Sequence, residues 1–127
     1  MERPDQLVDI VHQVALWLLP ILAAVIFHEV AHGVMALRLG DDTALRSGRL
    51  TLNPLPHIDP IGTVVMPCLL MLAGMPVFGY ARPVPVDFGR LGNPRRDMIA
   101  VALAGPGTNV ALALVSAAAF HALKAQL

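Results

Sequence analysis

Charged residues are scarce in this 127-residue chain. They make up 14% of it, against about 25% in an ordinary soluble domain. Nine basic and nine acidic residues cancel, so there is no excess positive charge to bind nucleic acid, and we expect no nucleic-acid partner. Hydrophobic residues make up 56% of the chain, more than a domain of this length can bury in its own core. The composition predicts a membrane protein whose surplus apolar surface faces lipid.

Cysteine and a basic N-terminal region are also lacking. The single cysteine, Cys68, excludes an intrachain disulfide and a thiolate metal site. Before the first apolar run, Glu2, Asp5 and Asp9 outnumber Arg3, and no small-residue cleavage site follows. A signal peptide begins with a positive region, so we expect this segment to belong to the mature protein.

Three long apolar segments stand out, near residues 10–37, 61–80 and 98–123. The first contains one acidic residue, Glu29, and the other two contain no acidic residue, lysine or arginine. Each is long enough for a transmembrane helix, which needs roughly 20 apolar residues. We therefore predict an all-α membrane protein with about three transmembrane helices, forming a single unit over residues 1–127.

Prolines interrupt all three predicted spans. Pro20 lies in the first, Pro67 and Pro76 in the second, and Pro106 in the third. A proline removes one intrahelical hydrogen bond and tends to kink the helix. Membrane helices tolerate such breaks where neighbouring helices or water satisfy the freed backbone groups. The pattern favours a packed bundle around something polar.

The connection between the first two spans favours a short β-hairpin or extended element. Residues 49–52 (R-L-T-L) alternate polar and apolar side chains after the turn-forming pair Ser47-Gly48. Three X-Pro pairs follow in residues 53–60, and a residue before proline prefers extended geometry. We also expect residues 83–86 (P-V-P-V) to be extended. With three spans, the basic residues divide five against four between the two sides, which does not decide the orientation.

The strongest local motif is F-H-E-V-A-H at residues 27–32. His28 and His32 are four residues apart and share one helix face, so both can bind one Zn²⁺. Glu29 can then act as general base on a zinc-bound water, whose pKa the metal lowers. A polar surface helix could carry the same letters, but this motif lies in an apolar run. An ionisable group there costs roughly 2.5–3.5 kcal/mol, which favours metal ligation.

Several motifs in series resemble the site-2 protease family of intramembrane zinc metalloproteases, in its compact prokaryotic form. They are F-H-E-V-A-H-G (27–33), G-R-L-T-L-N-P-L-P-H-I-D-P-I-G-T (48–63), G-Y-A-R-P-V-P-V (79–86), N-P-R-R-D (93–97) and A-G-P-G-T-N (104–109). The resemblance implies zinc as cofactor, His28 and His32 as ligands, and Glu29 as catalytic base. It also implies a multi-pass protein of the plasma membrane that cleaves transmembrane protein substrates in regulated proteolysis.

One part of the family's metal site is missing. The third ligand in that family is an aspartate in a Leu-Asp-Gly motif, and no acidic residue follows Asp97 here. Three explanations stay open. The chain is truncated before that motif, another chain or a second copy supplies the carboxylate, or a local group such as Asp59 or His57 substitutes. For His57 and Asp59, ordinary turn chemistry is the simpler interpretation.

Asn109 also has two interpretations. Asparagine within an apolar span often joins helices by hydrogen bonds, and it can also support a site or contact substrate; we favour packing. For the whole chain, the main hypothesis is a zinc-dependent intramembrane endopeptidase. The rival is a non-catalytic membrane module that binds zinc weakly or binds protein partners. The missing ligand favours the rival, and the retention of Glu29 in an apolar run argues against it.

Overall fold

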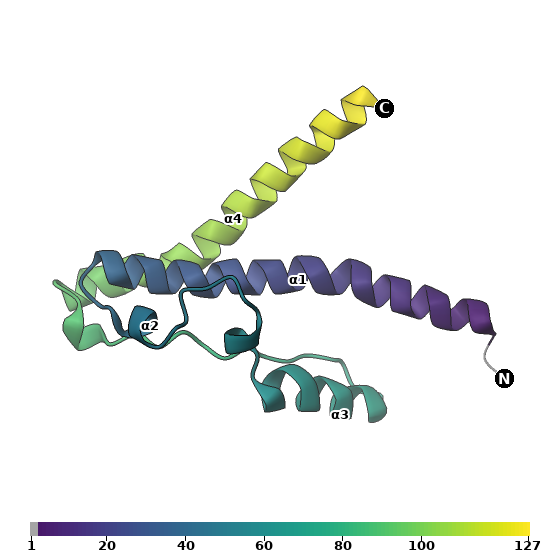
Figure 1. Ribbon diagram of the computed structural model, residues 1–127, viewed down its shortest axis with the longest axis horizontal. Coiled ribbons are helices and arrows are strands. Elements are labelled where there is room, and N and C mark those ends of the chain that lie inside the picture. The colour runs from purple at the N-terminus through teal and green to yellow at the C-terminus, as the bar shows by residue number, and fades with distance from the viewer. Residues whose placement is uncertain (1–2) are drawn as a thin grey trace.

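The computed structural model describes residues 3–127, which form helices joined by irregular segments. Two long helices dominate: α1 (Pro4–Arg38) and α4 (Pro94–Gln126) (Figure 1). The elements between them are short. They are α2 (Thr43–Arg46), the 3₁₀ turn η1 (Leu55–His57), the π-helical segment η2 (Pro60–Val65), α3 (Met66–Leu72) and the 3₁₀ turn η3 (Phe88–Arg90).

Local sequence explains where the two long helices begin and end. Pro4 opens α1, where its missing N–H costs nothing, and Gly40 follows the helix with a φ of 110°, which glycine adopts readily. At the start of α4, the Asn93 side chain accepts a hydrogen bond from the Arg96 N–H. The Asp97 carboxylate in turn accepts from the Asn93 N–H at 2.9 Å. These reciprocal bonds satisfy donors that a helix start leaves free.

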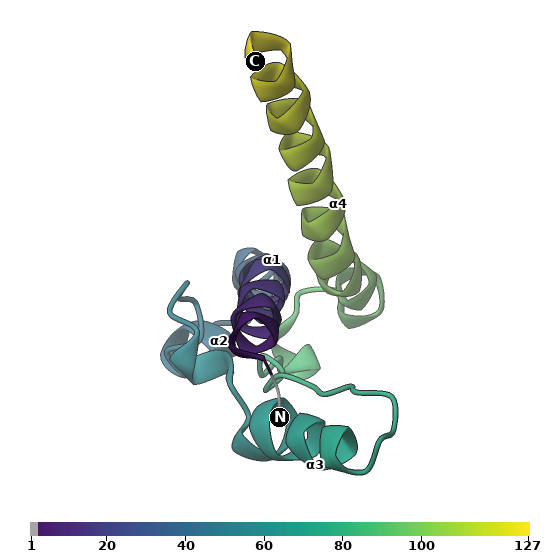
Figure 2. The ribbon, with the colours of Figure 1, turned by 90° about the vertical axis from the view of Figure 1, so that its right-hand side faces the viewer.

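The two long helices run in opposite directions and cross. The end of α1 and the start of α4 are joined by a hydrogen bond from the Gly92 N–H to the Leu39 carbonyl. A small core of Ala36, Leu91 and Val101 lies at this end. Beyond the crossing the helices diverge, and the C-terminal half of α4 stands apart from the other elements in both views (Figures 1 and 2).

Both long helices are long and apolar enough to cross a membrane. The most apolar 18-residue window of α1 is 6% buried, and that of α4 is 11% buried. A core helix of a soluble protein would be mostly buried. Large side chains such as Trp17, Leu19 and Leu114 are instead more than half exposed, which is the exposure expected of helices that face lipid.

The second predicted span, 61–80, is not a continuous helix. Helical structure from Pro60 to Leu72 covers 13 residues, about 20 Å at 1.5 Å per residue, short of the ~30 Å hydrocarbon core. Gly74, with a φ of 69°, turns the chain back along α3 (Figure 1). The Tyr80 N–H then donates to the Gly62 carbonyl, and the Arg82 N–H to the His57 carbonyl. The segment leaves and returns to the same end of the molecule.

The predicted hairpin near residues 49–52 is also wrong, because residues 3–127 contain no β-strand. The Arg49 side chain, rather than a backbone ladder, makes the contacts with the segment at residues 82–83. The expected extended geometry is confirmed at Asp59, which precedes Pro60 (φ −96°, ψ 120°), and is wrong at Leu55, which precedes Pro56 but lies in η1. Pro54 has helical angles (φ −66°, ψ −26°) and leads into the 3₁₀ turn η1. Residues 83–86 are irregular and belong to no helix or strand.

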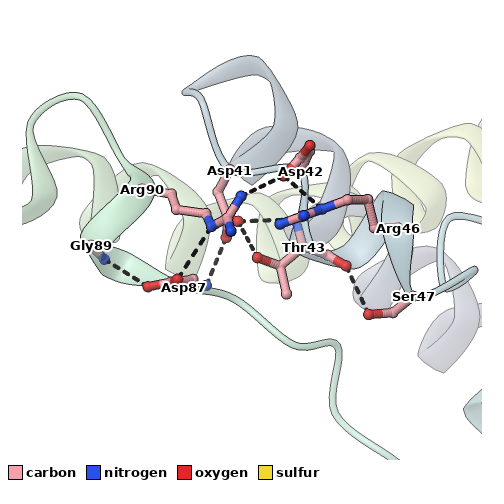
Figure 3. A network of polar contacts seen from close by, with 8 residues as sticks. All are labelled: Asp41, Asp42, Thr43, Arg46, Ser47, Asp87, Gly89 and Arg90. Atoms are coloured by element: carbon pink, nitrogen blue, oxygen red, sulfur yellow. Dashed lines mark hydrogen bonds and ion pairs between the residues drawn. The ribbon is translucent and has the colours of Figure 1, made fainter.

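A network around Asp41 fixes the irregular segments to the end of α1 (Figure 3). Asp41 is fully buried and accepts hydrogen bonds from the Thr43 N–H (3.0 Å), the Thr43 hydroxyl (2.5 Å) and the Asp87 N–H (2.7 Å). Burial alone would raise the pKa of Asp41, but these bonds and the Arg90 charge outweigh it and lower the pKa. Arg90 also pairs with Asp42 at 3.1 Å and Asp87 at 3.4 Å.

Candidate metal centre

His28, Glu29 and His32 come together on one face of α1. All three are partly buried, and their ligand atoms lie within 4.8 Å of one another. The two histidine Nε2 atoms are 2.9 Å apart. Two nitrogens bound to one tetrahedral zinc ion at 2.0–2.1 Å would be about 3.3 Å apart, so a small rotation of either ring would suit the pair to one ion.

The backbone of α4 fixes the proton on His32. Its Nδ1 lies 2.6 Å from the Val101 carbonyl oxygen. A carbonyl oxygen can only accept, so Nδ1 carries the proton and donates it to this bond. The His32 Nε2 therefore keeps a free lone pair directed towards His28. Metal-binding histidines usually have such a partner on the other ring nitrogen.

Asn109 contacts the far side of the His28 ring. Its side-chain amide lies 3.3 Å from His28 Nδ1, and Asn109 Oδ1 is buried without a hydrogen-bond partner among the described residues. Turning the amide by half a turn directs Oδ1 at His28 Nδ1, which then donates and leaves Nε2 free to ligate. Asn109 thus joins α4 to α1, as the packing interpretation expects, and it does so through a candidate metal ligand.

Gly105 is the third contact of α4 with the histidine pair. A β-carbon at this position would lie 2.5 Å from His32 Nε2 and 2.7 Å from His28 Nε2. Any side chain would occupy the space directly over the two ligand atoms. The absence of a β-carbon leaves a hollow in front of two lone pairs, and this hollow and donor set fit a zinc ion.

Glu29 is held by the irregular segment before η3. The Val84 N–H donates to Glu29 Oε2 at 2.9 Å. Beside this contact, Glu29 and His32 open onto a pocket of about 410 Å³. Its other lining residues are apolar: Pro83, Val84, Val86, Phe88, Met98, Val101 and Ala102.

His57 and Asp59, the local candidates for a third ligand, are occupied elsewhere. His57 is 2% exposed, and its ring nitrogens contact the Arg49 guanidinium (3.3 Å) and the Thr51 carbonyl (2.9 Å). Asp59 caps η2 by accepting from the N–H groups of Ile61 and Gly62. Among residues 3–127, the group that could hold a metal ion contains His28, Glu29 and His32 alone.

Sequence reasoning did not predict the contacts of Val84, Val101 and Gly105 with the site. Val84 and Val101 act through backbone atoms, which leave no trace in residue type. Gly105 and Asn109 belong to the A-G-P-G-T-N motif, which was the available signal for this part of α4. Its contact with α1 depends on where the two helices cross.

The chain is similar to curated bacterial proteins named as putative zinc metalloproteases. It is 47% identical to YwhC of Bacillus subtilis over 88 residues, 69% of this chain and 37% of YwhC. Rip2 of Mycobacterium tuberculosis is 35% identical over 103 residues, 80% of this chain and 38% of Rip2. Rip2 of Mycolicibacterium smegmatis is 33% identical over 95 residues, 74% of this chain and 35% of that protein.

The matched regions therefore span little more than a third of these relatives. No protein-family model matches the chain, and no solved structure matches it. The names of the relatives agree with the metal and the reaction class that the H-E-x-x-H motif predicts.

Proposed function

We propose that this chain carries the zinc-binding catalytic core of an intramembrane metalloendopeptidase of the site-2 protease type. The observation that carries the proposal is the pair of Nε2 atoms 2.9 Å apart on His28 and His32, each ring supported on its far side from α4. Such support orients ligands and raises their basicity. The relatives named as zinc metalloproteases support the same chemistry.

Glu29 is the proposed general base. Zinc, when bound by His28 and His32, would supply a Lewis acid that acidifies water and polarises the substrate carbonyl. The Val84 N–H occupies Glu29 Oε2 and leaves Oε1 to take a proton from the attacking water. The protonated carboxyl group would then donate to the leaving amine. No acyl-enzyme intermediate is needed.

The position of the motif in α1 supports hydrolysis within the membrane. His32 and His28 precede the last residue of α1, Arg38, by six and ten residues, which corresponds to about 9 and 15 Å along the helix. With Arg38 at the membrane surface, the site would lie inside the hydrocarbon layer. The proposed substrate is a transmembrane protein segment that unwinds locally, with an apolar side chain in the pocket beside Glu29 and His32.

The alternative function is a non-catalytic membrane module that binds zinc or protein partners. One observation favours it: residues 3–127 offer two histidines and Glu29 as candidate ligands, whereas a catalytic zinc site normally has three protein ligands and a separate base. The endopeptidase proposal therefore requires a further ligand from outside the described residues, supplied by another part of the protein, a second copy or another chain.

The test is cleavage of a transmembrane substrate by the protein purified in detergent together with the part, copy or chain that supplies the further ligand, with zinc content measured in parallel. The expected result is that Glu29→Gln retains zinc and loses cleavage by several orders of magnitude. Equal cleavage by wild type and Glu29→Gln would reject the proposed base. Zinc binding without cleavage in the wild type would favour the non-catalytic module.

A further inference from the structure

Arg49 is a buried cation outside the proposed metal centre. It is 7% exposed, and arginine is rarely buried unless it is paired. Its Nη1 donates to the Pro83 carbonyl at 3.2 Å, and its Nη2 donates to the Arg82 carbonyl at 2.6 Å. Nη2 also lies 3.3 Å from His57 Nδ1, while Nε is buried without a partner among the described residues. Burying an arginine is costly, so these hydrogen bonds are needed to stabilise the buried guanidinium.

The segment that Arg49 holds has an unusual backbone. In Arg82-Pro83-Val84-Pro85-Val86, both prolines lack an N–H group and have a fixed φ. The Val84 N–H is therefore the one backbone donor between Arg82 and Val86. That donor is the group that binds Glu29 Oε2.

One peptide group connects Arg49 to Glu29. The Pro83 carbonyl and the Val84 N–H belong to the same peptide unit, which is planar and trans. Its oxygen and its hydrogen point in opposite directions, so Arg49 binds one side and Glu29 binds the other. Hydrogen bonds in such a chain polarise and strengthen one another.

The charge of Glu29 and the packing against α1 both hold the Arg49 and Val84 segments near the site. Burial, followed by the nearby Arg82 charge, lowers the pKa of the Arg49 guanidinium, and attraction to the Glu29 carboxylate offsets part of this effect. The side chains of Leu50 and Val84 both lie over Gly33, where a β-carbon would collide with Leu50 and come within 3.3 Å of Val84. The two segments are therefore pressed onto α1 one residue after His32.

We propose that Arg49 is a positioning residue for Glu29, acting through the peptide unit between Pro83 and Val84. Its guanidinium fixes this unit so that the Val84 N–H holds one carboxylate oxygen and directs the other towards the reacting water. The catalytic meaning of this role rests on the proposed function. The hydrogen-bonded connection itself can be tested without any cleavage.

The test is hydrogen–deuterium exchange at the Val84 amide, which the flanking prolines make easy to isolate. Arg49→Met removes the charge and keeps the length of the side chain; Arg46→Met is the matched control, because Arg46 is exposed and pairs with Asp42 at the surface. We expect Val84 to exchange about tenfold faster in Arg49→Met, the effect of losing roughly one net hydrogen bond. The control should exchange at the wild-type rate. A wild-type rate in Arg49→Met would overturn the proposal.

A conservative variant covers the case in which Arg49→Met does not fold. Arg49→Lys keeps the charge, but an ammonium group lacks the planar fork that spans two carbonyl groups. Val84 should exchange faster in Arg49→Lys than in wild type and more slowly than in Glu29→Ala, which removes the acceptor. Exchange in Arg49→Lys at the wild-type rate would contradict the positioning role.

Kinetics on the zinc-loaded protein separate positioning from simple structural support. In Arg49→Met we expect kcat to fall by about a hundredfold, as for a misplaced catalytic group, with KM and zinc content unchanged. A parallel loss of zinc would show a merely structural role and overturn the proposal. If the wild type proves inactive, the proposed function fails, and the exchange experiment still decides whether Arg49 holds Val84.

Discussion

At Gly105, the backbone of α4 lies so close to the rings of His28 and His32 that even a β-carbon would collide with both candidate zinc ligands. Alanine there would force the helices apart or rotate the histidine rings. We predict that Gly105→Ala lowers zinc affinity by about ten- to a hundredfold, the range seen when support for a ligand is lost. Zinc competition with a chelator provides the measurement.

Gly107→Ala is the control for this prediction. A β-carbon at Gly107 meets nothing within 4 Å, so the same substitution in the same helix should leave zinc affinity unchanged. If both variants bind zinc as the wild type does, the hollow at Gly105 has no role in the site.

Asn109 offers a chemical test of how His28 is held. If His28 Nδ1 donates to Asn109 Oδ1, Asn109→Asp retains the acceptor and should bind zinc at least as well as wild type. Asn109→Ala should bind about tenfold more weakly, and Thr108→Ala serves as the neighbouring control. Weaker binding in Asn109→Asp than in Asn109→Ala would mean that His28 Nδ1 accepts, and that the proposed ligand atom is wrong.

At the scale of elements, the Asp41 network provides a prediction about pH. The folded pKa of Asp41 is below its ordinary value of 3.8, so its ionised form contributes stability that is fully present above about pH 4. This contribution is lost as pH falls through the folded pKa. Asp41→Asn cannot accept from both Thr43 and Asp87, and should destabilise the protein by about 1–3 kcal/mol at pH 7.

Thermal unfolding in detergent at pH 7 and at pH 3 measures this effect. The difference between wild type and Asp41→Asn should shrink at the lower pH. Asp42→Asn is the control, because its carboxylate is 44% exposed and surface ion pairs contribute about 0–1 kcal/mol. An equal difference between wild type and Asp41→Asn at both pH values would contradict the role of the ionised carboxylate.

Two of the three predicted spans agree with the observed helices, and the second span and the hairpin do not. The first and third predicted spans lie within α1 and α4. A long apolar run that begins with proline and has few charges rarely forms anything other than a long helix. The second failed because apolar length says nothing about direction: Gly74 and the Met75-Pro76 pair turn the chain back. The hairpin failed because the residues before the turn at Ser47-Gly48 form the helix α2 and leave residues 49–52 without a strand to pair with.

The residues of the candidate site also fall into those that the sequence could predict and those that it could not. His28, Glu29 and His32 could be predicted because their spacing of one helical turn is local to α1. Asn109 lies 81 residues from His28, and its contact depends on the crossing of two helices. Val84 contributes a backbone N–H and Val101 a backbone carbonyl. Residue type does not reveal such groups, because every residue has a carbonyl and every residue except proline has an N–H.

At the scale of the whole molecule, two antiparallel helices that are long and apolar enough to cross a membrane change the expected topology. Both ends of the described chain lie on one side, and the end of α1 meets the start of α4 on the other, from which α3 reaches back beside α1 (Figure 1). Seven of the nine basic residues then belong to the connecting side. They are Arg38, Arg46, Arg49, Arg82, Arg90, Arg95 and Arg96. The positive-inside rule therefore predicts that the connecting side faces the cytoplasm.

Single cysteines test this topology in a Cys68→Ser background. An impermeant thiol reagent should label cysteines at Ser47 and Gly89 from the cytoplasmic side, and cysteines at Gln6 and Gln126 from the opposite side. Labelling of Ser47 and Gly89 from opposite sides would restore the three-span topology. Labelling of both from the outside would keep two spans and reverse the orientation.

In the proposed metal centre, the side chains of His28 and His32 hold one zinc ion next to Glu29. X-ray absorption spectroscopy of the zinc-loaded protein tests this arrangement most directly. We expect two imidazole nitrogens of this chain at about 2.0–2.1 Å from zinc. Glu29→Gln should retain this signal, and it should be lost when either histidine is replaced by alanine. Zinc bound with an unchanged spectrum in His28→Ala and His32→Ala would show that these histidines are not the ligands.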